Sequence, residues 1–287
     1  MKILQFYKIS ILAVSLVLLG GLSTVKAENV SPASEIMLNS DRKILSELIQ
    51  TNIIYLGETH DNPEDHQKQL QILQALHQHQ SKIAIALEMF QRPFQTAIDR
   101  YLAGEITEAE LRQQTEYDDR WGYDWEFYAP ILRYAKTHKL PVLALNVPSE
   151  IARKVAAGGL ESLSPEESQQ IPPASEIRTD NAAYRQRLEV EFNRHLEAGH
   201  GNSKGFERFF LVQVLWDETM AETIAQFWQD RPDYQIVVLA GKGHIEYGDG
   251  IPSRVERRLQ GSYFVQRSVW LGEFPEGETE PADFAWP

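Results

Sequence analysis

The chain has 287 residues, of which 43% are hydrophobic and 24% charged, a balance typical of a folded globular protein. Its formal net charge of −13, without any cluster of Lys and Arg in the sequence, argues against nucleic acid and anionic membrane surfaces as partners. The sequence contains no Cys, which excludes disulfides, thiolate metal sites, a Cys nucleophile and a lipid anchor on an N-terminal Cys.

The N-terminus has the pattern of a secretory signal peptide. Lys2 and Lys8 precede the apolar run ISILAVSLVLLGGLS, and small or apolar residues then lead to an expected cut after Ala27. The apolar run is short for a membrane span of about 20 residues, and retention as an uncleaved anchor is the alternative. We therefore expect residues 1–27 to direct export to the periplasm or the cell exterior, with membrane attachment only if this segment is retained.

Beyond this segment, short apolar runs alternate with helical patterns. An amphipathic helix from about Pro63 follows the first run, helical pieces over 92–138 follow the second, and a helix at 149–157 follows the third. This alternation predicts one α/β domain over 34–270, with a mostly parallel sheet flanked by helices. The runs expected as strands lie at 53–57, 82–88, 141–148, 235–240 and 262–269.

Two segments depart from this alternation. The stretch AAGGLESLSPEESQQIPPASE is rich in Gly, Pro, Ser and Glu, and it predicts the start of a helical insertion at about 158–208. A charged helix near 180–198 and a Gly-rich loop belong to this insertion. Residues 271–287 form an acidic, Pro-rich tail that we expect to be loosely held.

Two of the expected strands end in the same motif, Gly-x-x-His. The first runs from Gly57 to His60 and the second from Gly241 to His244. In a parallel sheet the carboxyl ends of the strands lie along one edge, and ligands bind just outside that edge. We therefore expect both histidines to face one pocket. The two glycines permit a positive φ and a close approach of the backbone.

Glu88 directly follows the apolar run IAIAL, where a lone buried carboxylate is costly unless it is paired or bound to a cation. Two imidazoles and one carboxylate predict a site for Zn, Fe, Mn or Co, held by His60, Glu88 and His244. The same residues could instead form a general base with an orienting carboxylate.

Each of these side chains also has a purely structural interpretation. His60 could cap the following helix, and His244 could satisfy a loop carbonyl. Glu88 could pair with Arg92, four residues along the chain, in an ion pair that could also support a site. Asn146, before Val147-Pro148, is favoured as a turn residue rather than as a ligand.

Five blocks of the sequence resemble a known family. Their order and spacing over roughly residues 40–270 resemble the ChaN-like haem-binding domain of the haem-binding uptake/Tiki superfamily. The resemblance implies a parallel-centred α/β sheet with an added helical lid. The superfamily joins exported haem-binding iron-uptake proteins to Tiki-type metal-dependent proteases, with erythromycin-esterase-like hydrolases as more distant relatives. The blocks are IIYLGETHDNPEDH, IALEMFQRP, YDWEFYAPILRYAKTHKLPVLALNVP, VQVLWDETMAETI and VVLAGKGHIEYGDGIPSRV.

The resemblance carries over to particular positions. The paired motifs of the Tiki branch match residues 57–60 and 241–244, with Glu88 at the intervening acidic position. Glu58 and His60 resemble the Glu and His of the esterases' G-E-x-x-H, although the spacing here is one residue shorter, which weakens transfer of their base mechanism. The ChaN branch binds haem near the lid through Tyr and His side chains, for which the nearest candidates in the insertion are Tyr184, His195 and His200.

The sequence thus predicts an exported haem-binding protein of the ChaN type, acting in haem or iron handling, with haem as its cofactor and a homodimer as one arrangement. The alternative is a metal-dependent peptidase or esterase in which His60, Glu88 and His244 hold a divalent ion. In that alternative Glu58 serves as general base beside His60, supported by Arg92 and Asn146. In a third interpretation the strand-end polar residues belong to a non-catalytic scaffold.

Overall fold

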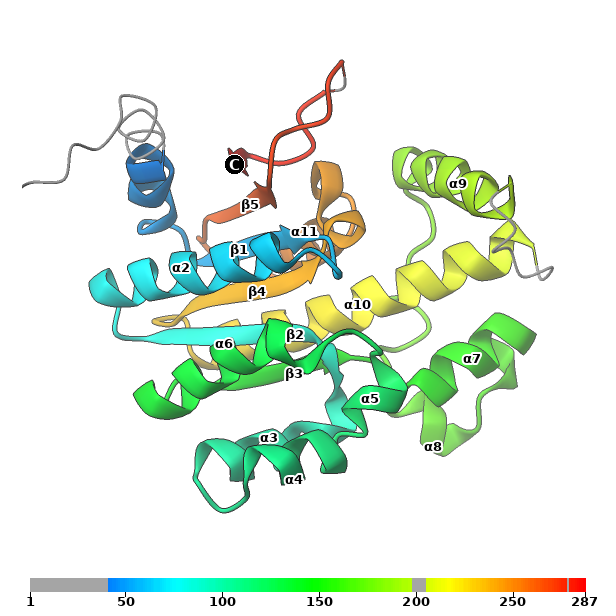
Figure 1. Cartoon of the computed structure of the whole chain (residues 1–287). Helices are drawn as coiled ribbons and strands as arrows, with labels where there is room; N and C mark the ends of the chain where they lie inside the picture. Colours follow the sequence, from blue (N-terminus) through cyan, green and yellow to red (C-terminus); the bar gives the residue numbers. More distant parts are fainter. Residues whose placement is uncertain (1–40, 198–204, 278) are drawn as a thin grey trace, which may run out of the picture. The chain divides into compact units, whose positions relative to one another are not determined.

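A computed structural model describes residues 41–197, 205–277 and 279–287 of the chain. The expected signal peptide and His200 lie outside the described residues. The described chain folds around a six-stranded sheet in the order β3-β2-β4-β1-β5-β6, and every pairing between these strands is parallel (Figure 1). The predicted α/β class with a mostly parallel sheet is confirmed. The strands are β1 (Ile53–Glu58), β2 (Ile83–Gln91), β3 (Val142–Asn146), β4 (Gln235–Gly241), β5 (Gln266–Leu271) and β6 (Phe284–Trp286).

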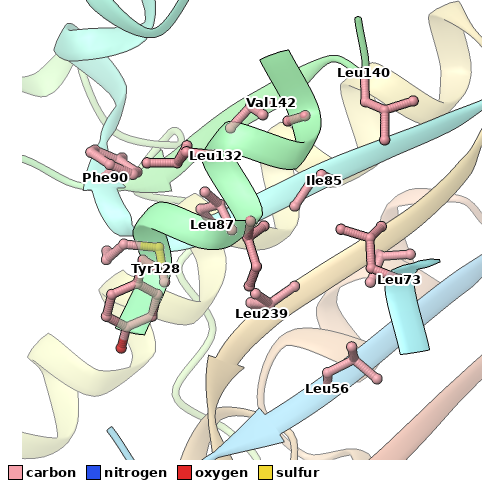
Figure 2. Close-up of a cluster of buried hydrophobic side chains, with 14 of the residues drawn as sticks. Leu56, Leu73, Ile85, Leu87, Phe90, Tyr128, Leu132, Leu140, Val142 and Leu239 are labelled. Carbon is pink, nitrogen blue, oxygen red and sulfur yellow. The ribbon is translucent and has the colours of Figure 1, made fainter. Parts of the chain in front are cut away.

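Helices cover both faces of the sheet, as the apolar strands require. On one face, alternate residues of β1, β2 and β4 pack with α2 and α6; Figure 2 shows Leu56, Leu87 and Leu239 in this cluster. On the other face, α10 and α11 pack against the remaining strand residues. Since β1, β2 and β4 are buried along their whole length, they lack polar alternation. The helices are α2 (Pro63–His79), α3 (Gln95–Leu102), α4 (Glu108–Gln114), α5 (Tyr117–Arg120), α6 (Trp125–His138), α10 (Phe206–Asp230) and α11 (Ile251–Arg258).

A third apolar cluster lies around the N-terminal half of α10. The helix α7 (Ser149–Gly158), which precedes the predicted insertion, gathers there in Figure 1 with the helices of the insertion, α8 (Pro165–Ser168) and α9 (Ala182–Glu197). Residues of α7, α9 and α10 pack together in this cluster with Val147, which directly follows β3. The insertion is therefore anchored where β3 ends, at the carboxyl edge of the sheet.

The C-terminal tail is held more firmly than its composition suggests. Its last residues form β6 beside β5. The carboxylate of Asp283 accepts hydrogen bonds from the backbone N–H and the hydroxyl of Ser268 (2.7 and 2.9 Å). These bonds explain why a polar, Pro-rich segment returns to the sheet. Within the described residues, no helix has the length and apolar character needed to cross a membrane.

Candidate functional site at the carboxyl edge of the sheet

The two Gly-x-x-His motifs are neighbours because β1 and β4 are adjacent strands. Their parallel register pairs Glu58 with Gly241, so that the two turns leave the sheet at the same level. Lys242 ties one turn to the other, because its Nζ donates to the hydroxyl of Thr59 (3.0 Å) and lies 3.2 Å from Asp65 Oδ2. Asp65 also accepts the backbone N–H of Thr59 (2.8 Å). A buried carboxylate on α2 thus fixes both turns.

The glycines of the motifs permit the close approach of one turn to the other. A Cβ on Gly57 would lie 2.4 Å from Cδ1 of Ile245, and a Cβ on Gly241 would lie 2.8 Å from Cε1 of His60. Gly241 has φ −58°, and neither glycine adopts a positive φ. The positive φ that glycine permits is therefore not used at either position, whereas the close approach is found. Gly57 thus makes room for Ile245, which directly follows the second motif, and Gly241 makes room for His60 of the first motif.

Replacing Gly241 by alanine should displace the imidazole of His60, because the new methyl group would occupy space that the ring now fills. We expect a loss of about 1–3 kcal/mol in the free energy of unfolding, the usual cost of overpacking. Denaturant unfolding and the ring NMR signals of His60 measure the two effects. Gly243→Ala is the matched control, since a Cβ there meets nothing within 4 Å. Equal stability of the two variants would contradict this account.

His60 is oriented by Glu58. Glu58 Oε1 accepts hydrogen bonds from His60 Nδ1 (2.8 Å) and from the hydroxyl of Tyr128 (2.5 Å), and Oε2 accepts one from Gln69 (2.7 Å). The proton on Nδ1 therefore points at Glu58, and Nε2 has no hydrogen-bond partner among the described residues. Burial opposes charge on His60, but the hydrogen bond to Glu58 and the negative charge of Glu88 outweigh it and raise the pKa of the imidazole.

His244 is clamped between two carboxylates. Its Nδ1 lies 2.7 Å from Asp217 Oδ1, and its Nε2 lies 3.3 Å from Glu88 Oε1. Both nitrogens can donate only in the imidazolium form. Burial disfavours the charge on His244, but the negative charges of Glu88 and Asp217 and the hydrogen bonds to them raise its pKa well above the ordinary value.

Glu88 is the carboxylate on which the two histidines converge. Its Oε2 accepts the backbone N–H of Gly241 (2.7 Å). Burial alone would raise the pKa of Glu88, but the positive charge of His244, its hydrogen bond and the charge of His60 lower this pKa to about 2. We conclude that Glu88 is ionised and that its charge is neutralised by imidazolium rather than by Arg92.

The stability of the fold should depend on pH through this pair. Glu88 has a lowered pKa, so its contribution is present above the ordinary value of 4.5 and is lost as the pH falls toward 2. His244 has a raised pKa, so its contribution is full below 6.5 and is lost as the pH rises toward the pKa of the folded state. Denaturant midpoints from about pH 3 to 8 should fall less steeply on the acid side in Glu88→Gln than in the wild type. Parallel curves would refute this linkage.

The metal site predicted for His60, Glu88 and His244 is not supported. Among the residues that the structure describes, no three His, Asp or Glu side chains are grouped so that they could hold a metal ion. The reason lies in their hydrogen bonds: both nitrogens of His244 face carboxylates, and Glu88 is engaged by His244 and Gly241. The three residues meet at one edge, but as an ion-paired cluster.

Two clefts open on either side of this cluster. The larger, of about 970 Å³, lies between the two turns and α9, and the smaller, of about 560 Å³, lies toward α5 and α7. A third hollow, of about 1160 Å³, lies between α11 and the C-terminal residues and is lined by neither Gly-x-x-His motif. His60, Tyr123, Ala156, Val212, Gln213 and His244 line both of the first two clefts.

The remaining predicted site residues have structural partners. Arg92 pairs with Glu222 of α10 (2.8 Å) and not with Glu88, so the structural alternative of a Glu88–Arg92 ion pair is wrong. Asn146 Oδ1 accepts the backbone N–H of Val147 (2.9 Å), the behaviour of a turn residue, and it lines the smaller cleft. His195 belongs to α9, and its side chain lies outside the described part of the structure.

Tyr184 lies in the wall of the larger cleft, but its hydroxyl donates to Asp217 Oδ2 (2.6 Å). Burial and the negative charge of Asp217 raise the pKa of this phenol well above its ordinary value. Because iron is bound by the phenolate, the structure argues against Tyr184 as a haem ligand. Its role is to support Asp217.

Sequence reasoning missed several residues of the cluster. Asp217 and the adjacent Glu218 are both fully buried in α10. The sequence contains an indication of their burial, because these two consecutive acidic residues lie inside a strongly apolar helical segment. Tyr123 is 37% exposed, and its ring centroid lies 5.0 Å from that of His60.

Comparison with known proteins agrees with this architecture. Residues 44–255 match the family described as haem-binding uptake, Tiki superfamily, ChaN. A solved structure described as cofacial haem binding to ChaN of Campylobacter jejuni superposes with a TM-score of 0.65 at 20% identity, covering 85% of this chain and 90% of that one. An erythromycin esterase mutant, EreC H289N, superposes with a TM-score of 0.48 at 14% identity, covering 85% of this chain and 79% of that one.

A curated relative is the chloroplastic protein RETICULATA-RELATED 5 of Arabidopsis thaliana, which is 26% identical over 262 residues. The match covers 85% of this chain but only 35% of the length of that relative. The family match contains both Gly-x-x-His motifs and the strands β1 to β4. Since the family match extends over well more than half of the chain, the protein belongs to the ChaN family of the haem-binding uptake, Tiki superfamily.

Proposed function

We propose that this protein binds haem in the larger cleft and acts in haem or iron handling. Membership of the ChaN family supports the ligand class, as does the description of the Campylobacter jejuni relative as a haem-binding protein. The cleft, of about 970 Å³, falls in the range of small-molecule and cofactor sites, which runs to about 1,000 Å³. Leu188, Phe192, Phe209, Val212 and Trp270 supply apolar wall for a porphyrin.

The observation that carries this proposal is the hydrogen bonding of the two ring nitrogens of His60. Its Nδ1 donates to a buried carboxylate, as in imidazoles that ligate metals, its Nε2 has no hydrogen-bond partner among the described residues, and the residue lines the cleft. His60 would therefore hold the haem iron through Nε2. Arg187, Arg208 and Lys242 line the same cleft and would face the propionates. When bound, haem supplies an iron centre whose reactivity depends on its axial ligand.

A hemin titration tests this proposal. Purified protein at micromolar concentration should shift and sharpen the Soret band of hemin, with a defined stoichiometry. The affinity should rise with pH through the raised pKa of His60, because Nε2 must lose its proton to ligate iron. A Soret band identical to that of free hemin at micromolar concentration would rule the proposal out. Sedimentation of the titrated sample reports whether loading produces a homodimer, one of the arrangements that the sequence leaves open.

A second candidate is hydrolysis by general acid–base catalysis. The observation in its favour is that each histidine of the cluster is hydrogen-bonded to its own carboxylate, His60 to Glu58 and His244 to Asp217. His60 would be the base, and it lines the smaller cleft as well as the larger one. A panel of chromogenic esters and peptides would test this role, and turnover that survives His60→Ala would exclude it.

We also propose export, as the N-terminal sequence predicts. Fractionation of cells that express the full chain, followed by mass measurement of the exported product, tests this proposal. A product that begins at Glu28 supports a cleaved signal, and retention of the full-length chain in the membrane fraction supports an anchor. Accumulation of the full-length chain in the soluble cell interior would refute export.

A further inference from the structure

A chain of buried polar groups links the insertion to the histidine cluster. The hydroxyl of Tyr184, on α9, donates to Oδ2 of Asp217, on α10, at 2.6 Å. The other carboxylate oxygen of Asp217 accepts from His244 Nδ1 at 2.7 Å. Tyr184 is 1% exposed and Asp217 is 0% exposed, so water does not replace either bond. Haem binding as proposed above uses neither Tyr184 nor Asp217.

These contacts fix the ring of His244. Asp217 holds Nδ1, and Glu88 of β2 faces Nε2 at 3.3 Å. Arg254 of α11 approaches Asp217 to 3.8 Å, and the ring of Trp216 lies 6.3 Å from that of His244. The charge of His60, on the turn that follows β1, also acts on Glu88 and His244. If the imidazole ring rotated, two buried carboxylates would each lose one of their partners, which is costly.

The same helix is attached to the segment that follows His244. The side-chain amide of Asn181, just before α9, donates to Asp249 Oδ1 at 2.8 Å, and Arg187 forms an ion pair with the same carboxylate. Helix α9 also forms one wall of the larger cleft, through Tyr184, Arg187 and Leu188. Its docking therefore involves the cleft and the histidine cluster together.

We propose that Tyr184 and Asp217 are positioning residues that couple the docking of α9 over the cleft to the orientation of His244. When α9 is docked, Asp217 is held by Tyr184 and in turn holds the His244 ring toward Glu88. When α9 moves away, Asp217 loses a buried donor and the restraint on the ring is weakened. Since coupling free energies are reciprocal, a change in the docking of α9 should alter the orientation of His244, and a change at His244 should alter the docking of α9. The link to ligand binding rests on the proposed function, whereas the coupling itself is a property of the unliganded protein.

Two variants test the coupling in the unliganded protein. Tyr184→Phe should change the ¹⁵N signals of the His244 ring. The substitution removes only the hydroxyl of residue 184, which contacts Asp217 rather than His244, and it keeps the aromatic ring at this position. Asp217→Asn should speed hydrogen exchange of the α9 amides by about tenfold or more, the effect expected from weakening a hydrogen bond to a charged group. Tyr134→Phe, which removes a hydroxyl bonded to His77 rather than to this cluster, is the control and should change neither signal.

Hemin titration of the same variants separates this inference from the proposed function. If wild-type protein binds hemin, Tyr184→Phe should weaken binding several-fold while the far-UV spectrum stays native. If wild-type protein binds no hemin, the NMR and exchange measurements still decide the coupling. Unchanged His244 signals in Tyr184→Phe, or unchanged α9 exchange in a folded Asp217→Asn variant, would overturn it.

Discussion

Replacing His60 by alanine should weaken hemin binding by about 100-fold or more, since loss of a supporting carboxylate alone typically costs 10–100-fold in metal affinity. In this site Nε2 of His60 has no hydrogen-bond partner in the described part of the chain, whereas both nitrogens of His244 face carboxylates. The Soret titration of wild type and variant measures the change. The fold should survive, because the side chain of His60 is 25% exposed at the cleft.

The control for this experiment is His79→Ala. His79 is exposed at the C-terminal end of α2, at the opposite edge of the sheet from the cleft, and its replacement should leave the hemin affinity unchanged. Glu58→Gln should give an intermediate loss, because the amide no longer holds the proton on Nδ1 with a charge. Equal affinities of wild type and His60→Ala would show that iron is held elsewhere.

Replacing Glu218 by alanine should cost about 3–5 kcal/mol of unfolding free energy, the range expected when one partner of a buried ion pair is removed. Glu218 is 0% exposed, and its carboxylate lies 2.6 Å from Arg257, 2.6 Å from Arg258 and 3.4 Å from Arg254. The variant would leave these guanidinium groups of α11 without their shared counter-charge. Denaturant unfolding measures the loss directly.

A surface ion pair provides the comparison. Asp118 pairs with Arg112 at 2.6 Å, but both side chains are about half exposed, so Asp118→Ala should shift the unfolding midpoint only slightly. A loss of stability in Glu218→Ala no larger than that in Asp118→Ala would mean that water reaches the arginines of α11. The account of the α10–α11 interface as a buried charge network would then be wrong.

The sequence alone was sufficient to predict the parallel sheet and the meeting of the carboxyl ends of its strands at one edge. Apolar strands without polar alternation predicted burial on both faces, and the parallel direction predicted that residues after each strand share one edge. His60, Glu88 and His244 lie together for that reason. The order of β1 and β4 as direct neighbours was not predicted, because strand order depends on crossover connections rather than on local pattern.

The chemistry of the cluster was harder to predict than its location. Two imidazoles and a carboxylate suit a metal, and only the approach of Asp217 from α10 shows that His244 is occupied on both sides. Asp217 is 27 residues from His244 along the chain, and no local periodicity relates the two. Similarly, Tyr184 is a candidate ligand by residue type, but its hydroxyl turns out to be used internally.

The most direct test of the proposed function is a crystal structure of the protein with bound hemin, in which anomalous scattering locates the iron. We predict iron in the larger cleft, beside Nε2 of His60 and facing α9. Iron in the hollow between α11 and the C-terminal residues, or on the surface away from both Gly-x-x-His motifs, would contradict the assignment of this edge as the haem site.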